Sequence, residues 1–505
     1  MFDIVDEQVY NNRKLVIYDL VTYEYIVGYG IWRSSMFLCR EKELGILSRR
    51  YNGSDPECVI IYGRRRVGKT ALINEFTRSR KCIYFPALDS TAQDNLTALS
   101  KSIQSYLNPA RKEYPVYNSF DAAFDEITDI AKKERIIVAI DEFPYLAKAE
   151  RSIPSRLQHL IDHDWQKTGI FLILCGSSIS FMEKEVLGEK SPLFGRRTCQ
   201  LKIEPLDYLE TAKFNPDLKP EDNALIYAVT GGVPHYINKL NVHGDLKTAL
   251  VENLFDTSSY LFEEPGNLLK QELREPAVYN SIITAVAAGR TRLADIAGAV
   301  HLETSACSGY LNSLQKLGIV TRTEPVVDRS KRKIQYRVAD QFFRFWYRFV
   351  PANMMSISSG KISKIYDKAI GSYLDQYMGL TFEEISKQFL LKYDDDLDFS
   401  IADIGEWWGA HPEKHKEVQL DIVAVAPKEN NTSNGTSYLI GSCKYTNDKV
   451  GLKELELIGD YASVFTSAED TCRYCLFSKS GFTDDLKSLA EDGQVRLYNL
   501  ADMYY

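Results

Sequence analysis

The sequence predicts an α/β protein built from several domains, and three patterns support this prediction. A β-branched apolar run at 59–62 leads directly into a glycine-rich loop and then a segment with helical spacing. A second apolar run, 135–140, ends in two acidic residues, and ligands of open parallel sheets bind at such strand ends. Near the C-terminus, polar and apolar residues alternate with the period of a strand. We therefore expect a parallel sheet with a helical lid, short helices with a two-stranded wing, and a second α/β domain.

The chain has 505 residues, which is too long for one hydrophobic core. Changes in period and in turn residues predict domains at 36–200 (α/β core), 201–275 (helical lid), 276–340 (winged helix) and 341–505 (second α/β domain). Residues 1–35 form an N-terminal extension without the positive start or cleavage site of a signal peptide. Two interpretations stay open: either Met36 is the natural start, or the extension is a strand-forming arm.

The composition is that of an ordinary globular protein, with 45% hydrophobic and 26% charged residues. A formal net charge of -8 argues against a protein that coats nucleic acid along its whole surface, but it leaves room for one basic module. The nine cysteines lack the spacing of a disulfide framework, which favours a reducing compartment and hence the cytoplasm. No apolar run approaches the roughly 18–20 residues of a membrane span, so we expect no membrane partner.

The loop at 63–70 has the GxxxxGK[ST] pattern, which cradles phosphate between a strand and a helix in P-loop NTPases. Gly63 and Gly68 let backbone N–H groups surround a β-phosphate, Lys69 reaches the β- and γ-phosphates, and the Thr70 hydroxyl ligates Mg²⁺. We expect the three arginine side chains of the loop to point outward, because the backbone makes the cradle. The pattern predicts ATP, ADP and Mg²⁺ as ligands of Gly63, Arg64, Arg65, Arg66, Val67, Gly68, Lys69, Thr70 and Ala71.

Two acidic residues at the end of the second apolar run are candidates for the hydrolytic chemistry. Asp141 is expected to hold Mg²⁺ through water, and Glu142 to orient and deprotonate the attacking water. A third apolar run, 170–175, ends in Gly-Ser-Ser. Ser177 is expected to contact the γ-phosphate as a sensor; the alternative is a turn that merely ends the strand.

A pair of arginines follows this third strand. Arg196 and Arg197 are candidate catalytic residues that supply positive charge to the γ-phosphate, either in the same chain or in a neighbouring subunit. The alternative is that they bind helix ends or acidic side chains. Further on, the turn residues at 230–234 predict a hinge within the lid.

Helical periods at 277–288, 293–300 and 305–317 precede two strand-like runs around a basic stretch, 328–333. This pattern predicts a winged helix-turn-helix, which contacts double-stranded DNA through its phosphates. Such modules also serve as intramolecular lids or dimer surfaces, and both interpretations stay open. The aromatic segment 340–349 has helical spacing, which predicts a packing core rather than a base-stacking surface.

The C-terminal region shows the layout of PD-(D/E)xK nucleases, in which carboxylates hold a divalent metal beside a lysine. Asp421 lies on one predicted strand and Lys444 on the next, with a loop at 429–437 between them and Glu384 on an upstream helix. Ser442 stands where the second acid of the pattern belongs, and a serine supplies no anionic ligand. We therefore expect a relic site whose nuclease activity is lost.

The chain resembles the archaeal-type ATPase family of AAA+ proteins, close to the signal-transduction ATPases with numerous domains (STAND), in the motifs at 39–44, 62–70, 140–145, 175–178, 193–198 and 230–236. Motifs at 339–342, 407–409 and 477–482 also fit, so the resemblance covers nearly everything from Met36 onward. Cys39 stands where the family usually has Gly. The resemblance implies ATP binding and hydrolysis through Lys69, Thr70, Asp141 and Glu142, and a tail domain like restriction-type nucleases.

From these patterns we expect an AAA+ ATPase that hydrolyses ATP to drive a conformational switch, linked to DNA or to defence against mobile elements. Such a switch works as a homo-oligomer or on a protein partner. Two rival hypotheses are an ATP-gated DNA endonuclease and a regulatory module that binds nucleotide without hydrolysing it. Glu142 argues against the second rival, because a pure binder needs no acid that activates water.

Overall fold

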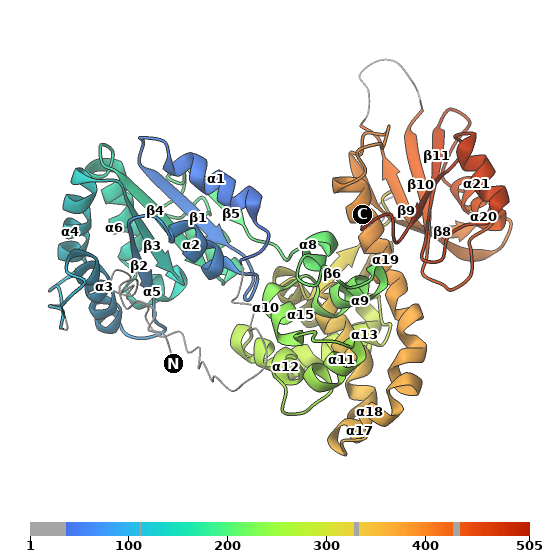
Figure 1. The fold of residues 1–505 in the computed structure, drawn as a ribbon, viewed down its shortest axis with the longest axis horizontal. Coiled ribbons are helices and arrows are strands. Elements are labelled where there is room, and N and C mark those ends of the chain that lie inside the picture. The colour runs from blue at the N-terminus through green and yellow to red at the C-terminus, as the bar shows by residue number, and fades with distance from the viewer. Residues whose placement is uncertain (1–36, 112, 328–332, 428–434, 505) are drawn as a thin grey trace, which may run out of the picture. The chain divides into compact units, whose positions relative to one another are not determined.

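A computed structural model describes residues 37–111, 113–327, 333–427 and 435–504. The expected N-terminal extension, most of the basic stretch at 328–333 and most of the loop at 429–437 lie outside these described residues. The described chain forms two compact units (Figure 1). The first contains residues 37–62, 69–177 and 181–202, and the second contains 63–68, 178–180 and 203–504.

The first unit is built on a five-stranded parallel sheet with the strand order β2-β3-β4-β1-β5. Its strands are β1 (Glu57–Tyr62), β2 (Cys82–Pro86), β3 (Ile136–Asp141), β4 (Ile170–Gly176) and β5 (Cys199–Lys202). Every residue of β3 and β4 is buried, which means that both faces of the sheet are covered. The helices of this unit are α1 (Glu41–Tyr51), α2 (Lys69–Thr77), α3 (Ala92–Leu107), α4 (Phe120–Lys133), α5 (Phe143–Ala149) and α6 (Ile153–His159). Two of the three residues of the short helix α7 (Ile179–Phe181) belong to the second unit. The predicted α/β fold is confirmed.

The strand order determines which residues meet at the edge of this sheet. Strands β3 and β4 are parallel neighbours, so their carboxyl ends lie at the same edge. Asp141 ends β3, and Ser177 directly follows β4. Strand β2 adds Tyr84 beside them, because Pro86 pairs with Asp141 in the register.

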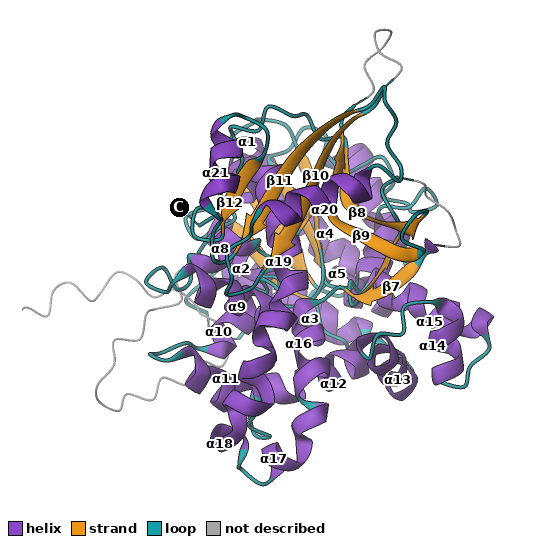
Figure 2. Ribbon diagram, turned by 90° about the vertical axis from the view of Figure 1, so that its right-hand side faces the viewer, coloured by secondary structure: helices purple, strands orange, loops and turns teal. Residues whose placement is uncertain are grey.

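The second unit begins with a segment made almost wholly of helices (Figure 2). These are α8 (Tyr208–Ala212), α9 (Pro220–Thr230), α10 (Pro234–Leu240), α11 (Leu246–Leu254), α12 (Tyr260–Glu272), α13 (Pro276–Ala287), α14 (Leu293–Ala299) and α15 (Thr304–Lys316). Strands β6 (Val320–Thr323) and β7 (Gln335–Val338) then pair antiparallel. The last three helices and this strand pair lie where the sequence predicts the winged helix, and DNA contact by that module stays a prediction.

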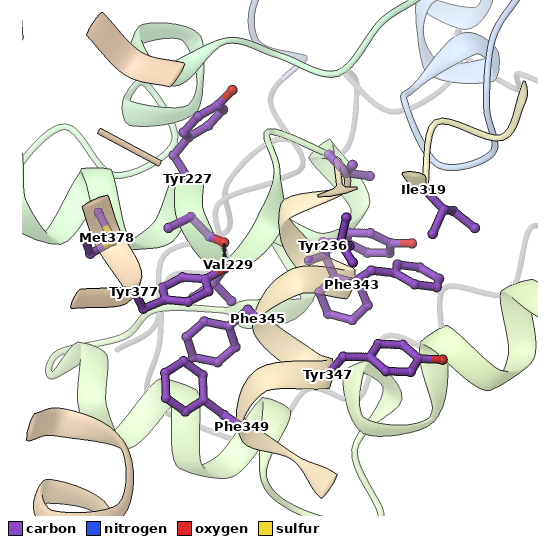
Figure 3. Close-up of a cluster of buried hydrophobic side chains, with 14 of the residues drawn as sticks. Tyr227, Val229, Tyr236, Ile319, Phe343, Phe345, Tyr347, Phe349, Tyr377 and Met378 are labelled. Carbon is purple, nitrogen blue, oxygen red and sulfur yellow. Dashed lines mark hydrogen bonds between the residues drawn. The ribbon is translucent and has the colours of Figure 1, made fainter. Parts of the chain in front are cut away.

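The aromatic segment forms α16 (Gln341–Phe349) and lies in the core of the second unit (Figure 3). Phe342, Phe343 and Phe345 are fully buried, and Tyr236 packs on Phe342 with ring centroids 4.4 Å apart. The prediction of a packing core is therefore confirmed. Two short helices, α17 (Met354–Ser358) and α18 (Ile362–Tyr366), lead from α16 to the long helix α19 (Ser372–Lys392).

The C-terminal part of the second unit contains a mixed sheet with the strand order β12-β11-β10-β9-β8. Its elements are β8 (Asp403–His411), β9 (Lys416–Val425), β10 (Ser437–Lys444), α20 (Leu452–Ala462), β11 (Thr471–Ser478), α21 (Asp484–Glu491) and β12 (Arg496–Asn499). Leu439 of β10 packs in the same core as Phe382 of α19, whereas the next residue, Ile440, packs with Ile458 of α20. Successive side chains of a strand point to opposite faces, so α19 and α20 cover opposite faces of this sheet.

The end of the described chain packs into the core of the second unit. Leu500 and Met503 are buried, and Tyr208 of α8 donates a hydrogen bond to the backbone oxygen of Met503 at 2.7 Å. Residues nearly three hundred positions apart therefore share one core. In neither unit does a described helix have the length and apolar character needed to cross a membrane.

Candidate nucleotide site

The glycine-rich loop joins β1 to α2, and its two glycines have backbone angles that suit glycine. The φ angle is +154° at Gly63 and +93° at Gly68. A Cβ atom at Gly63 would lie 2.2 Å from the carbonyl oxygen of Ile203, so no other residue fits there. Helix α2 begins at Lys69, directly after the loop, which places the loop's N–H groups at a helix N-terminus.

Each arginine of the loop has an acidic partner in the second unit. Arg64 lies 2.5 Å from Asp340, and Arg65 lies 2.5 Å from Glu272 at the end of α12. Arg66 pairs with Glu264, which is fully buried and also accepts a hydrogen bond from Tyr236, a residue of α10, at 2.7 Å. The sequence predicts only that these side chains point outward, because nothing local identifies partners about two hundred residues away or more.

Asp141 is the centre of a hydrogen-bond network at the sheet edge of the first unit. Its Oδ2 accepts hydrogen bonds from Thr70 Oγ1 at 2.7 Å and from Tyr84 Oη at 2.8 Å. Burial and the charge of Asp141 raise the pKa of the Tyr84 phenol, so Tyr84 stays a donor. Tyr84 was not among the site residues predicted from the sequence. The sequence feature that could have identified it is its position near the end of a short apolar run, 82–86. This run forms the strand that pairs with the strand of Asp141.

Glu142 contacts Ser177 across the ends of β3 and β4. Its Oε2 accepts hydrogen bonds from Ser177 Oγ at 2.8 Å and from the Ser177 backbone N–H at 3.3 Å. Glu142 has a φ angle of 51°, a left-handed conformation that is unusual for a residue other than glycine. The structure thus joins the predicted base and the predicted sensor directly, although they lie 35 positions apart in the sequence.

These residues fit a nucleoside triphosphate with Mg²⁺. The Thr70 hydroxyl and the Asp141 carboxylate are oxygen ligands of the kind that Mg²⁺ prefers, and the phosphates of a nucleotide supply further ligands. Lys69 is 6% exposed. Burial and the charge of Asp141 raise the pKa of the Cys175 thiol, and the nearby positive charge of Lys69 opposes this rise. The side chains of Lys69, Thr70 and Asp141 therefore lie within one small region of the first unit.

The structure separates the two candidate arginines. Arg196 binds Asp162 through two nitrogens, at 2.9 and 2.8 Å, and donates to the Phe194 carbonyl at 2.9 Å. This is the alternative to the predicted role, because the Arg196 guanidinium is already bound to an acid. Arg197 differs: its Nη1 is buried without a hydrogen-bond partner among the described residues, and its guanidinium lies 6.0 Å from the Phe194 ring centroid.

The candidate nuclease residues only partly come together. Asp421 Oδ2 accepts hydrogen bonds from Ser442 Oγ at 3.1 Å and from the Cys443 N–H at 2.9 Å. Lys444 lies 3.0 Å from Glu454 of α20, a residue that was not predicted from the sequence. Glu454 is also an alternative acceptor for the single Ser442 hydroxyl proton, with its Oε1 at 2.7 Å from Ser442 Oγ.

The predicted acid Glu384 and its neighbour Glu383, both on α19, have different surroundings. Burial and the charge of Asp421 raise the pKa of Glu383 to about 8, so Glu383 is the acid beside Asp421. Glu384 is exposed and accepts a hydrogen bond from Gln388 instead. Within the described part of the chain, no three His, Cys, Asp or Glu side chains converge as a metal-binding group.

Comparisons with known proteins agree with the geometry of the loop. Residues 37–240 match the family described as an ATPase domain predominantly from Archaea, and residues 346–456 match a family of archaeal and bacterial proteins of unknown function. The uncharacterized protein MJECL04 of Methanocaldococcus jannaschii is 31% identical over 394 residues, which cover 77% of this chain and 84% of the relative.

Two solved structures match this chain at low sequence identity. The Walker-type ATPase PABY2304 of Pyrococcus abyssi is 19% identical with a TM-score of 0.49, over 62% of this chain and 96% of that chain. The STAND protein PH0952 of Pyrococcus horikoshii is 17% identical with a TM-score of 0.28, over 71% of this chain and 52% of that chain. The domain match and the extended similarity to the M. jannaschii protein decide the family: this chain belongs to the ATPase family found predominantly in Archaea.

Proposed function

We propose that this protein binds ATP with Mg²⁺, hydrolyses it, and uses the nucleotide state to switch the arrangement of its second unit. The observation that carries the proposal is the network of Thr70, Asp141, Glu142 and Ser177 at the carboxyl edge of the parallel sheet. In this proposal the backbone of 63–68 cradles the phosphates, Lys69 contacts the β- and γ-phosphates, and Thr70 and Asp141 hold Mg²⁺. The bound Mg²⁺ neutralises charge on the phosphate oxygens.

Glu142 is the general base in this proposal. Its carboxylate orients a water molecule and takes a proton from it as the water attacks the γ-phosphorus. A module that only binds nucleotide would need no such acid, which is why we favour hydrolysis over that rival. Arg197 is a better candidate than Arg196 for a charge donor to the γ-phosphate, because Arg196 is bound to Asp162.

The ion pairs of the loop arginines support the switch. Arg64, Arg65 and Arg66 bind residues at the start of α16, at the end of α12 and in the middle of α12. A rearrangement of the loop on nucleotide exchange therefore acts directly on these helices. A ligand can shift such an equilibrium only through contacts that differ between the two states, and the γ-phosphate supplies that difference.

The first experiment is ATP turnover by the purified protein beside Glu142→Gln and Lys69→Ala, with and without double-stranded DNA. We expect Lys69→Ala to lose nucleotide binding, and Glu142→Gln to keep binding and lose turnover. Stimulation by DNA would support a DNA-linked switch through the segment 276–340. Turnover that ignores DNA would point to a protein partner or a second copy of the chain. A wild type that binds ATP but never hydrolyses it would overturn the proposal in favour of a binding module.

We also propose that the tail domain has lost nuclease activity. The basis is the closed charge network, in which Lys444 is bound to Glu454 and the Ser442 hydroxyl bridges Asp421 and Glu454. Incubation of the protein with linear and supercoiled DNA in Mg²⁺ or Mn²⁺ should give no cleavage. Cleavage that is lost in both Asp421→Asn and Lys444→Ala would contradict this proposal and favour the ATP-gated endonuclease.

The proposed location is the cytoplasm. The nine cysteines all lie within the described residues and form no disulfides with one another, and most of them are buried in the cores of the two units. Buried thiols of this kind are typical of proteins kept in a reducing compartment. Fractionation of cells of the source organism, with antibody detection of the native protein, would test this assignment.

A further inference from the structure

A strand of the segment 276–340 is bound to the C-terminal mixed sheet. Arg337 of β7 donates a hydrogen bond from Nη1 to Oε2 of Glu406 in β8 at 2.6 Å, and its guanidinium lies 5.9 Å from the Trp408 ring centroid. Tyr336 and Val338, on either side of Arg337, are buried in the core of the second unit. Because successive side chains of a strand point to opposite faces, β7 gives one face to that core and the other to the mixed sheet.

The edge of the mixed sheet is shaped to receive this segment. β8 is an edge strand, and its pairing with β9 shifts in register between Gly405 and Trp407, which places Glu406 at a β-bulge. The Glu406 backbone oxygen accepts a hydrogen bond from the Val326 N–H at 3.0 Å. A Cβ atom at Gly405 would lie 2.6 Å from Cγ2 of Val326, so glycine permits this close approach. Glu406 therefore binds the segment 276–340 through both its backbone and its side chain.

The same piece of chain is bound to the glycine-rich loop only three residues further on. Asp340, two residues after the end of β7, lies 2.5 Å from Arg64 of the loop. The backbone N–H of Ala339 donates to the Ile319 oxygen at 2.9 Å, which holds the connection in place. Three extended residues span roughly 10 Å. The ion pair of Arg337 and that of Asp340 are thus joined by a short, hydrogen-bonded stretch of backbone.

We propose that residues 337–340 are a relay that couples the glycine-rich loop to the tail domain, and that the ion pair between Arg337 and Glu406 acts on it as a brake. This inference rests on the proposed ATPase function and names the path by which nucleotide acts on the tail. The brake stabilises the arrangement in which Asp340 holds Arg64. A nucleotide that favours another position of the loop works against this pair, so the contacts that fix the tail weaken ATP binding. By linkage, ATP weakens the tail contacts by the same factor.

A double-mutant cycle on nucleotide binding tests the relay. The measured quantity is the Kd for ATPγS in Mg²⁺, for the wild type, Glu406→Gln, Asp340→Asn and the double variant. We expect Glu406→Gln to lower this Kd about fivefold, the effect of one lost hydrogen bond, because the brake is weakened. Asp340→Asn removes the carboxylate that binds Arg64, so in that background Glu406→Gln should leave the Kd unchanged.

A second variant breaks the same ion pair from its other side. Glu406 also accepts hydrogen bonds from Lys387 at 3.5 Å and from Gln419 at 3.2 Å, and Glu406→Gln alters these contacts too. Arg337→Gln leaves both acceptors in place. A similar decrease of the Kd in Arg337→Gln therefore assigns the effect to the ion pair, whereas a wild-type Kd in this variant would overturn the brake.

Equal decreases of the Kd in both backgrounds would overturn the relay, since Glu406 would then act on the nucleotide without Asp340. An unchanged or raised Kd in Glu406→Gln would overturn the brake. Glu413→Gln is the matched control, because Glu413 is an exposed acid between β8 and β9 and its substitution removes the same charge. If Asp340→Asn does not fold, Arg64→Gln repeats the cycle from the side of the loop.

Hydrogen exchange measures the reverse direction of the coupling. ATPγS should speed the exchange of the Val326 N–H, which is bonded to Glu406, about fivefold in the wild type and not in Asp340→Asn. Identical protection with and without nucleotide in the wild type would contradict the relay. A wild type that binds neither ADP nor ATPγS overturns the proposed function and the relay with it. Binding without turnover overturns hydrolysis alone and leaves the cycle decisive.

Discussion

Arg64 and Asp340 form an ion pair of 2.5 Å, although 276 positions separate them in the sequence. Asp340 has a second task, because its other oxygen, Oδ1, accepts a hydrogen bond from the backbone N–H of Phe343 at 3.0 Å and caps α16. One buried carboxylate therefore binds the glycine-rich loop and starts the helix that carries the aromatic core.

This double role predicts different costs for two substitutions of Asp340. Asp340→Ala removes both contacts and leaves the Arg64 charge largely buried, so we expect a loss of about 3–5 kcal/mol in the free energy of unfolding. Asp340→Asn keeps a good helix cap, which is worth about 1 kcal/mol, and should be less costly by that amount. Urea unfolding of the full chain measures both values. If Asn and Ala cost the same, the cap contributes nothing.

Tyr84 is expected to tune the magnesium dependence of ATP turnover. Tyr84→Phe removes the hydrogen bond to Asp141 Oδ2, which leaves Thr70 as the donor to that oxygen. The loss of one such bond, about 1 kcal/mol, should raise the Mg²⁺ concentration for half-maximal turnover about fivefold. Tyr106→Phe is the matched control, because Tyr106 binds Glu134, which precedes β3 at its amino end. An unchanged Mg²⁺ titration would show that Tyr84 does not position Asp141.

Two glycine substitutions should have opposite effects on stability. Gly63→Ala would place a Cβ atom 2.2 Å from the carbonyl oxygen of Ile203, and the loop must move to accept it. We expect a lower unfolding temperature together with weaker nucleotide binding. Gly45 lies inside α1, and a Cβ atom there would have nothing within 4 Å, so Gly45→Ala should stabilise the protein by roughly 0.5–1 kcal/mol. Scanning calorimetry with and without ADP distinguishes the two.

The carboxyl group of Glu383 should make the stability of the protein fall with rising pH. Burial and the charges of Asp421 and Glu406 raise its pKa to about 8, while Lys387 and Arg337 oppose this rise. An unfolded Glu titrates near pH 4.3, so between about pH 4 and 8 the folded state binds the extra proton. The stabilisation that comes from the protonated Glu383 carboxyl is therefore complete below about pH 4 and is lost as the pH rises through 8.

Glu383→Gln removes this titration and gives a direct test. The variant should unfold at a higher temperature than the wild type at pH 9, and the difference should shrink towards pH 5. Glu384→Gln is the control on the same helix, since Glu384 is exposed. Parallel melting curves of the wild type and Glu383→Gln across this range would contradict the assigned pKa.

Local patterns were enough to predict the strand–loop–helix at 59–76 and the acids that end β3, because both depend on neighbouring residues. The same holds for α16, whose aromatic residues already have the period of a buried helix. Partners brought together by tertiary structure could not be found in this way. Tyr84 reaches Asp141 through the pairing of β2 with β3, and Glu454 reaches Lys444 because α20 folds back over β10. Whether Glu383 or Glu384 lies near Asp421 depends on the rotation of α19 about its own axis. The periodicity of the sequence does not define this rotation precisely enough to distinguish two adjacent residues.

The hydrogen bond between Tyr208 and Met503 also has a consequence for how the protein is made. The two residues are 295 positions apart, so α8 leaves the ribosome long before its partner exists. Because synthesis adds about 5–20 residues per second, the apolar face around Tyr208 stays unburied for roughly 15–60 s, until the strands and the final turn that cover it have been made. During this interval the nascent helices expose a surface that chaperones recognise. Premature termination upstream of Met503 should therefore yield an aggregation-prone fragment rather than a shortened but folded protein.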